Sequence, residues 1–433
     1  MTNRSEPGVQ RRLSRPPART AYAVWELTLA CNLACSHCGS RAGNARPHEL
    51  STSEALDVVD QLAQVGIVEV TLIGGEAFLR PDWLEIAAAI TNRGMRCTLT
   101  TGGYKLSPTT AQRMRAAGIV QASISIDGME QTHDALRGRK GSWQSCFRTA
   151  EHLQSAGIAV ACNTQVNRRT IVEVPLLYQA LLQAGTTAWQ LQLTVPLGRA
   201  ADQAELLLQP CELLAVFDVL ARVAERAEVD GMRVYAANNL GYHGPYEQLL
   251  RSPDGNQSWH GCQAGLSTIG IEADGTVKGC PSLPTADYSG GTVRRQRIAE
   301  MLSSAPEMNF NLLSEQSDRR GELWGFCRTC AHADTCRGGC SWTAHTLFGR
   351  RGNNPYCHHR ALELQRQGMR ERLLQIEPAI GVPFDYGRFT AVTESDDTPW
   401  PHHARPRLSA HDIQWPAPLF GQSRLAGAAE GAT

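Results

Sequence analysis

The sequence predicts an α/β fold built on a parallel sheet, followed by a second, cysteine-rich region. From residue 22 to about residue 227, short β-prone runs alternate with longer runs of helical periodicity, which is the pattern of repeated βαβ units. From residue 262 to residue 357, seven cysteines return within about a hundred residues. This density indicates a subdomain held together by metal.

Six strands and six helices are expected over the first region. The predicted strands are 22–30, 67–73, 95–100, 121–126, 158–166 and 188–194. The predicted helices are 51–65, 82–93, 108–117, 142–156, 170–183 and 210–227. The first helix opens with Ser51-Thr-Ser-Glu54, a capping box in which two side chains satisfy free backbone N–H groups at the helix start.

Composition excludes several classes of protein. Forty-two basic residues balance forty-two acidic ones, so no global field favours nucleic acid or an anionic membrane. No apolar run reaches the length of a membrane span, and residues 1–20 lack the apolar core of a secretory signal. Without such a signal, the fourteen cysteines favour metal binding over disulfides. We therefore expect a cytoplasmic metalloprotein.

The expected organisation has five parts, separated by changes in composition and pattern. They are a disordered leader at 1–20, the α/β region at 21–230, a linker at 231–261, the cysteine-rich region at 262–375 and a loosely ordered tail at 376–433. A last helix is predicted at 361–374.

Three cysteines, Cys31, Cys35 and Cys38, end the first predicted strand with the spacing C-x3-C-x2-C. Three thiolates can hold three irons of a four-iron cluster and leave the fourth iron free. A structural zinc site would need a fourth protein ligand close by. Buried apolar thiols, or a disulfide with one spare cysteine, are the structural alternatives.

Polar and glycine-rich segments follow the other strands, at the ends where a parallel barrel places its chemistry. Gly74-Gly75-Glu76 combines two glycines, which allow close approach of backbone to a ligand, with an acceptor. The third strand ends in Thr100-Thr101-Gly102-Gly103, and alternation in the fourth directs its polar residues to one side. In the fourth strand these residues are Ser123, Ser125 and Asp127. Polar residues that alternate along the fifth and sixth strands could face solvent, but inside a barrel they would line the cavity: Asn163, Gln165, Gln190 and Gln192.

These residues together resemble the radical S-adenosylmethionine superfamily, whose signature is the C-x3-C-x2-C spacing, with His37 at a position that is often aromatic there. The resemblance implies an open partial (β/α)6 barrel, because six units are too few for the eightfold barrel. It also implies that the three cysteines hold a [4Fe–4S] cluster whose free iron chelates S-adenosylmethionine. One-electron reduction would then release a 5′-deoxyadenosyl radical able to abstract hydrogen.

The same resemblance assigns cofactor contacts. The Gly-Gly-Glu element would hold the methionine amino group, and residues of the fourth strand the ribose and carboxylate. His133-Asp134-x-x-Arg137-Gly138 resembles a stretch of radical enzymes that modify peptides, and Arg137 is expected to pair bidentately with the methionine carboxylate. The expected cofactor-binding residues are Gly74, Gly75, Glu76, Thr101, Ser125, Asp127, Arg137, Asn163 and Gln165.

The second cysteine block follows a predicted hairpin of 269–273 and 276–278 around Asp274-Gly275. Its order is Cys262, Gly275-x4-Cys280, Cys327-x2-Cys330-x5-Cys336-x3-Cys340 and Cys357. Zinc ribbons are the alternative, since they often carry paired C-x2-C units. The order and spacing resemble instead the SPASM extension of the same superfamily.

That resemblance implies two auxiliary [4Fe–4S] clusters. One would be held by Cys327, Cys330, Cys336 and Cys357, and the other by Cys262, Cys280 and Cys340. Many members carry one more cysteine just before the first, and this chain does not. We therefore expect an open iron or a substitute ligand there, with Asp254 and His260 as nearby candidates. The isolated Cys97, Cys146, Cys162 and Cys211 are expected to be small buried apolar residues.

The resemblance favours a ribosomally made precursor peptide as substrate, modified by crosslinking, epimerisation or backbone excision, with the auxiliary clusters handling electrons. A flavodoxin or ferredoxin is the implied donor. About twenty residues precede the barrel, so the barrel surface or a separate recognition protein would bind the leader peptide.

Three alternatives remain open. Sulfatase-type formylglycine maturases resemble the chain but carry an aspartate where Pro281 stands. Small-molecule radical dehydrogenases can have similar extensions. An iron–sulfur carrier or a zinc-stapled binding module would leave Gly74-Gly75-Glu76 and the polar strand ends unexplained.

Overall fold

A ten-stranded curved sheet forms the centre of the molecule. The computed structural model describes residues 22–251, 258–316, 320–401 and 405–416, so the expected leader and Asp254 lie outside the described residues. The strands are β1 (Tyr22–Glu26), β2 (Glu69–Ile73), β3 (Arg96–Thr101), β4 (Gln121–Ser125), β5 (Ala159–Val166), β6 (Ala188–Leu193), β7 (Arg233–Ala236), β8 (Thr268–Ile271), β9 (Thr276–Lys278) and β10 (Ser289–Thr292).

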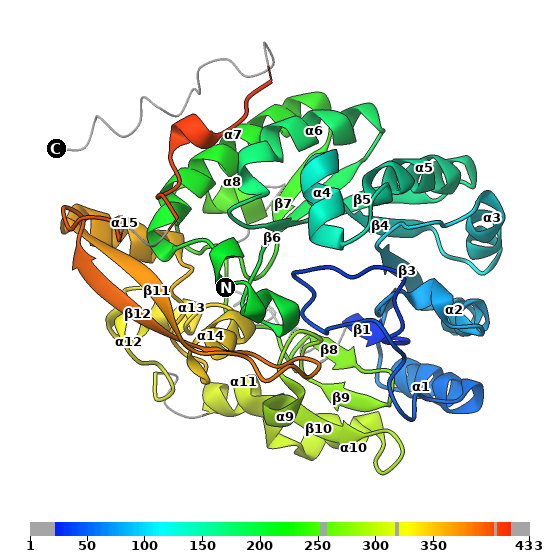
Figure 1. Cartoon of the computed structure of the whole chain (residues 1–433). Helices are drawn as coiled ribbons and strands as arrows, with labels where there is room; N and C mark the ends of the chain where they lie inside the picture. The colour runs from blue at the N-terminus through cyan, green and yellow to red at the C-terminus, as the bar shows by residue number, and fades with distance from the viewer. Residues whose placement is uncertain (1–21, 252–257, 317–319, 402–404, 417–433) are drawn as a thin grey trace, which may run out of the picture.

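The order of the sheet is β10-β9-β8-β1-β2-β3-β4-β5-β6-β7. Neighbours from β8 through β1 to β7 pair in parallel, whereas β9 is antiparallel to both β8 and β10. Helices cover the outer face of the curved sheet (Figure 1). This arrangement confirms the predicted partial barrel with parallel strands, and it shows that the cysteine-rich region continues the same sheet.

The helices of the barrel are α1 (Thr52–Gln64), α2 (Trp83–Asn92), α3 (Pro108–Ala116), α4 (Glu130–Arg137), α5 (Ser142–Ser155), α6 (Val174–Gln183), α7 (Leu213–Asp230) and α8 (Glu247–Arg251). Those of the cysteine-rich region are α9 (Thr285–Tyr288), α10 (Ile298–Ser304), α11 (Pro306–Gln316), α12 (Phe326–Thr329), α13 (Ala333–Cys336), α14 (Ser341–Phe348) and α15 (His358–Arg366). The six predicted helices and six predicted strands of the barrel are all present, with ends shifted by a few residues. In the described part of the chain, no helix is long and apolar enough to cross a membrane.

The expected linker at 231–261 contains regular structure. β7 joins the sheet beside β6, with Trp189 opposite Val234 in the register, and α8 follows it. The sequence prediction missed β7 because four residues are too few for a clear alternation.

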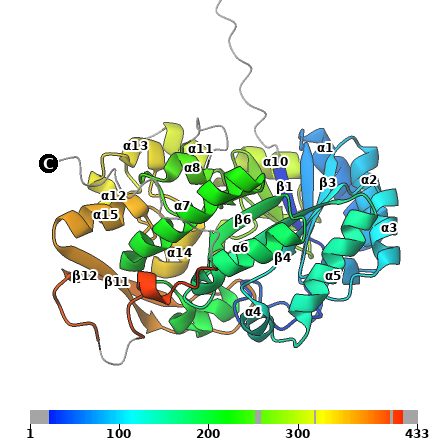
Figure 2. The same cartoon turned by 90° about the horizontal axis from the view of Figure 1, so that it is seen from above.

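The expected helix at 361–374 and the expected loose tail are also different in the structure. Helix α15 ends at Arg366, because Gly368 adopts a left-handed backbone with φ of 68°. The chain continues as β11 (Met369–Glu377) and β12 (Arg388–Ser395), an antiparallel two-stranded ribbon. The ribbon crosses the face of the molecule from α15 towards β8 and β9 (Figure 1; Figure 2 shows it from above).

The predicted capping box at the start of α1 is present. The Glu54 backbone N–H donates to the Ser51 hydroxyl at 3.3 Å, and the Ser51 backbone N–H donates to the Glu54 carboxylate at 2.8 Å. The helix so begun places Val58, Val59 and Leu62 in the core against the sheet, all fully buried.

Replacing Ser51 with Ala removes one half of this capping box. The free energy of unfolding is expected to fall by about 1 kcal/mol, measured by equilibrium urea unfolding of the apoprotein. The matched control is Ser155→Ala, an exposed serine at the end of α5 and far from this cap, which should leave stability unchanged or slightly higher. Equal losses in both variants would contradict a specific role of the cap.

Candidate active site

A cavity of about 240 Å³ opens at the carboxyl ends of the parallel strands. It brings together the three cysteines of the first motif and eight of the nine expected cofactor-binding residues. The lining residues are Cys31, Leu33, Cys35, His37, Cys38, Gly39, Ala42, Ile73, Gly74, Gly75, Thr100, Thr101, Gly102, Ser125, Asp127, Arg137, Asn163, Gln165, Gln192 and Arg199. Glu76 lies directly behind this lining, and Ser123 and Gln190 are not among the residues that form it.

Backbone hydrogen bonds hold the loop that carries the three cysteines, both within the loop and to helix α4. Near the start, the Cys31 N–H donates to the Gly43 carbonyl at 2.9 Å, so the loop closes on itself. In the middle, the N–H groups of Ala34 and Ser36 donate to carbonyls at the end of α4. The thiols are free. Burial raises the pKa of the Cys31 thiol to about 12, and Glu76 and the other two cysteines act in the same direction.

The two glycines after β2 are required by the packing of this loop. An added Cβ at Gly74 would lie 2.4 Å from the Thr28 carbonyl oxygen, and one at Gly75 would lie 2.3 Å from that of Ala30. The backbones are joined there, because the Gly75 N–H donates to Thr28 and the Glu76 N–H to Ala30, both at 2.8 Å. The glycines therefore let the end of β2 lie flush against the segment leading into the cysteines, in addition to lining the cavity.

Glu76 presents an unpaired oxygen in a buried position. One carboxylate oxygen accepts the Gly102 N–H at 2.9 Å, while Oε1 has no hydrogen-bond partner among the described residues. Burial raises the pKa of this carboxyl to about 7, against the opposing effects of Thr101 and the Gly102 N–H. An orphaned buried acceptor of this kind fits a ligand that carries a hydrogen-bond donor.

Asp127 is the central polar group of the site. It is fully buried, and one oxygen accepts from Arg137 at 2.5 Å and lies 3.0 Å from His37 Nε2. Its other oxygen accepts the Gln165 N–H at 2.7 Å. Burial alone would raise the pKa of this carboxyl, but Arg137 and His37 outweigh it and hold the pKa well below the usual value.

Arg137 is held by protein groups through part of its guanidinium. Nη2 donates to Asp127 and Nη1 lies 3.7 Å from Cys35 Sγ, while the buried Nε has no hydrogen-bond partner among the described residues. The expected pairing with a methionine carboxylate stays a prediction. α4, which carries Arg137, was not predicted because its eight residues are mostly polar. The arginine is a link between the cysteine loop and the fourth strand.

Seven further cysteines form two groups in the second region. Cys262 and Cys280 lie around one apolar cluster, and the Cys340 thiol is close enough to both that their charges raise its pKa, after the larger effect of burial. Cys327, Cys330, Cys336 and Cys357 surround a second small cavity with His243, His332 and His359. These are the two sets that the spacing resemblance grouped together.

Two aromatic residues connect these groups. The Tyr242 hydroxyl accepts the Cys340 N–H at 3.0 Å and donates to the Asn238 carbonyl at 2.8 Å. Trp342 packs against both groups of thiols.

His260, one of the two candidates for a substitute ligand, is exposed. The isolated Cys97, Cys146, Cys162 and Cys211 are buried as expected.

Comparison with known proteins agrees with this geometry. The chain matches the model of the radical SAM superfamily over residues 25–167 and that of the SPASM iron–sulfur cluster-binding domain over residues 262–331. It is 30% identical to the AdoMet-dependent heme synthase of Nitratidesulfovibrio vulgaris, over 78% of this chain and 92% of that protein. The chain is a radical SAM enzyme with a SPASM domain.

Other relatives extend the comparison. The radical SAM chain is 32% identical to the mycofactocin maturase MftC of Mycobacterium ulcerans, over 73% of this chain and 82% of that one. Among solved structures, Streptococcus suis SuiB bound to precursor peptide SuiA aligns with a TM-score of 0.59 and 14% identity, over 78% and 75% of the two chains. The structure of anSMEcpe with AdoMet and the Kp18Cys peptide aligns with a TM-score of 0.62 and 16% identity, over 79% and 96%. At these identities the structural likeness shows a shared fold.

The cavity fits the cofactors of a radical SAM enzyme, a [4Fe–4S] cluster and S-adenosylmethionine. Its lining offers three thiols, the donor set that leaves one iron of a four-iron cluster open, and the nearby His37 faces Asp127 at 3.0 Å. Within the described ranges, no three His, Cys, Asp or Glu side chains converge as they would around a single metal ion. Beside the thiols, Gly74 and Gly75 leave room for a ligand because they have no side chain, and the unpaired Glu76 oxygen provides an acceptor.

Replacing Gly75 with Ala places a Cβ against backbone atoms that cannot move aside. The end of β2 should separate from the cysteine loop, and binding of S-adenosylmethionine to the reconstituted radical SAM protein should weaken by about tenfold or more. Equilibrium dialysis measures this. The control is Gly43→Ala on the same loop, where an added Cβ meets nothing within 4 Å. Equal binding by both variants would contradict the packing argument.

Replacing Asp127 with Asn leaves the buried Arg137 without its counter-charge. The free energy of unfolding of the apoprotein is expected to fall by about 3 kcal/mol or more, measured as a lower urea midpoint. The exposed pair of Arg93 and Asp60 provides the control, because Asp60→Asn should change the midpoint little. A small effect of Asp127→Asn would show that Arg137 finds another partner.

Proposed function

We propose that this enzyme modifies a ribosomally synthesised precursor peptide by hydrogen abstraction. The observation that carries the proposal is the polarity of the cavity opposite the cysteines. Asn163, Gln165 and Gln192 contribute neutral amides there, and each side-chain amide both donates and accepts, as the peptide backbone does. The 32% identity with a peptide maturase supports the same substrate class.

The charges in the cavity also suit a neutral main chain. Two arginines line it, and protein groups already neutralise or bind both: Arg137 pairs with Asp127 through Nη2, leaving only its Nε without a partner among the described residues, and Arg199 donates to the carbonyls of Cys35 and Ala42 at 2.6 and 3.0 Å. A substrate rich in carboxylates would lose hydration on binding, and only cations without a protein partner could compensate this free-energy cost. The site provides hydrogen-bonding groups more readily than charges.

Within this proposal, the residues have distinct tasks. Cys31, Cys35 and Cys38 ligate the cluster, which when bound reductively cleaves S-adenosylmethionine and so supplies the hydrogen-abstracting radical. Glu76 offers its unpaired oxygen to the cofactor's ammonium group, and Asp127 holds Arg137 of α4 and His37 of the cysteine loop in place. Gly74, Gly75, Thr101 and Ser125 leave room for the cofactor along the strand ends.

The second region is proposed to hold two auxiliary clusters, one on Cys262, Cys280 and Cys340 and one on Cys327, Cys330, Cys336 and Cys357. They would take up the electron that remains when a substrate loses hydrogen and forms a new bond. A flavodoxin or ferredoxin is the proposed donor of the first electron. A separate recognition protein for the leader peptide is compatible with the proposal.

A second candidate is a step in the synthesis of heme from a porphyrin precursor, which the 30% identity with an AdoMet-dependent heme synthase favours. The two candidates separate in one assay. Reconstituted enzyme is incubated with S-adenosylmethionine and dithionite, and either iron-coproporphyrin or the peptide of a short reading frame beside the gene is added. A peptide mass change that depends on Cys31, Cys35 and Cys38 supports the proposal. Decarboxylation of the porphyrin with no peptide product would replace it.

Iron content tests the assignment of the cysteines. At about four irons per cubane cluster, the wild-type protein should hold about twelve irons after anaerobic reconstitution. The Cys31→Ala/Cys35→Ala/Cys38→Ala variant should hold about eight and no longer cleave S-adenosylmethionine. Stoichiometric zinc in the second region would contradict the auxiliary clusters while leaving the first assignment intact.

A further inference from the structure

The β11–β12 ribbon lies outside both matched family regions, which cover residues 25–167 and 262–331. Its turn, residues 378–387, reaches the cysteine loop and the auxiliary domain together. We call this turn the ribbon tip. A segment from late in the chain therefore lies beside the loop that carries the three cysteines of the active site.

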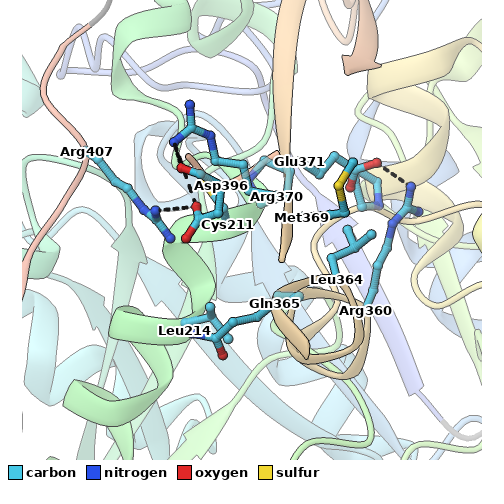
Figure 3. A pocket seen from close by; sticks show the side chains of 13 residues that line it. Cys211, Leu214, Arg360, Leu364, Gln365, Met369, Arg370, Glu371, Asp396 and Arg407 are labelled. Atoms are coloured by element: carbon cyan, nitrogen blue, oxygen red, sulfur yellow. Dashed lines mark hydrogen bonds and ion pairs between the residues drawn. The ribbon is translucent and has the colours of Figure 1, made fainter. Parts of the chain in front are cut away.

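The root of the ribbon is firmly fixed. Glu371 pairs with Arg360 of α15, and Asp396 accepts from Arg407 at 2.7 Å (Figure 3). The cavity among these residues measures only about 10 Å³. On the barrel side, the Leu373 N–H donates to the Gln209 side chain at 2.7 Å. The ribbon is thus a rigid arm and not a free tail.

At the other end, Asp385 joins the tip to the cysteine loop. Arg41, three residues after Cys38, donates from Nε to Asp385 at 2.7 Å and from Nη1 to Asp202 at 2.6 Å. The Asp385 carbonyl accepts the Gly198 N–H at 2.7 Å. Asp385 is buried and also accepts from N–H groups within the tip, so its carboxylate organises the turn and holds the arginine.

Phe384 joins the tip to a buried group of four charges. Its ring lies 4.1 Å from Lys278 Nζ and 5.5 Å from the Arg46 guanidinium. Arg46 in the cysteine loop pairs with Glu26 at 2.6 Å. The fully buried Lys278, two residues before Cys280, pairs with Glu272 at 2.7 Å. One aromatic ring therefore covers a cation from the cysteine loop and a cation from the auxiliary hairpin.

Tyr386 makes the third connection. Its hydroxyl is 2.8 Å from His345 Nε2, in the helix that begins after Cys340, and 3.2 Å from Asp287. Both Arg41 and Phe384 have left-handed backbones, with φ of 51° and 59°. Bulky residues avoid this conformation unless their surroundings impose it. Backbone strain is therefore found at Arg41 and at Phe384, the residue next to Asp385, which Arg41 binds.

We propose that the ribbon tip is a strap that positions the cluster-binding loop, with Phe384 and Asp385 as positioning residues. It fixes residues 39–46 against the auxiliary domain, so that the wall of the cavity formed by Gly39 and Ala42 keeps the shape that S-adenosylmethionine requires. The inference rests on the proposed assignment of Cys31, Cys35 and Cys38 as cluster ligands.

The test uses Phe384→Ala, Phe384→Leu and Asp385→Asn in the full chain, with Ile380→Ala as the control, since Ile380 lies in the same tip and is 82% exposed. Hydrogen exchange of the apoproteins is followed in peptides covering residues 39–46. EPR spectra of the reduced clusters are recorded with and without S-adenosylmethionine, together with KM and kcat for its reductive cleavage.

Phe384→Ala and Asp385→Asn should speed exchange at residues 39–46, change the EPR signal obtained with S-adenosylmethionine and raise its KM by about tenfold. Phe384→Leu should recover part of each effect, and Ile380→Ala should match the wild type. Unchanged exchange and EPR signals would overturn the proposal, as would faster exchange spread over the whole chain, which would mark the ribbon as a general stabiliser. Loss of the ligand assignment would appear separately, as iron retained in the triple cysteine variant.

Discussion

The ion pair between Asp127 and Arg137 is the contact on which the site depends. Neither group could be buried alone, because an uncompensated charge in the interior costs several kcal/mol. Asp127 lies two residues after the end of β4, and Arg137 is the last residue of α4. His37 belongs to the cysteine loop, and the Gln165 N–H belongs to β5. Four separate segments are thereby fixed to one carboxylate, and the position of the cysteines follows from it.

Much of the fold and site could be predicted because the signals are local. Alternating β and helical patterns located all six βα units, and residues at strand ends such as Gly75, Thr101 and Asp127 fall where a parallel barrel gathers its chemistry. The capping box at Ser51 and the hairpin around Asp274 need only neighbouring residues. The expected grouping of the later cysteines came from the resemblance of their order and spacing to the SPASM extension.

Other features depend on contacts between distant residues, which no local pattern reveals. The pairing of Arg137 with Asp127 was not predicted, because these two residues meet only after α4 folds against the fourth strand. The parallel pairing of β8 with β1 joins residues far apart in sequence, and Arg41 meets Asp385 across 344 positions. The first part of β11 was predicted as helix and the rest of the ribbon as a tail, because half of β11 is charged or polar and its order comes from contacts with α15 and the barrel.

The unbroken sheet from β10 to β7 has a consequence for access to the site. Two domains joined by a flexible linker can close on a substrate about a hinge and shut out water. Here the cysteine-rich region shares backbone hydrogen bonds with the barrel through β8 and β1, so rotation between them would break a ladder. A hinge rotation of this kind would therefore cost the backbone hydrogen bonds between β8 and β1.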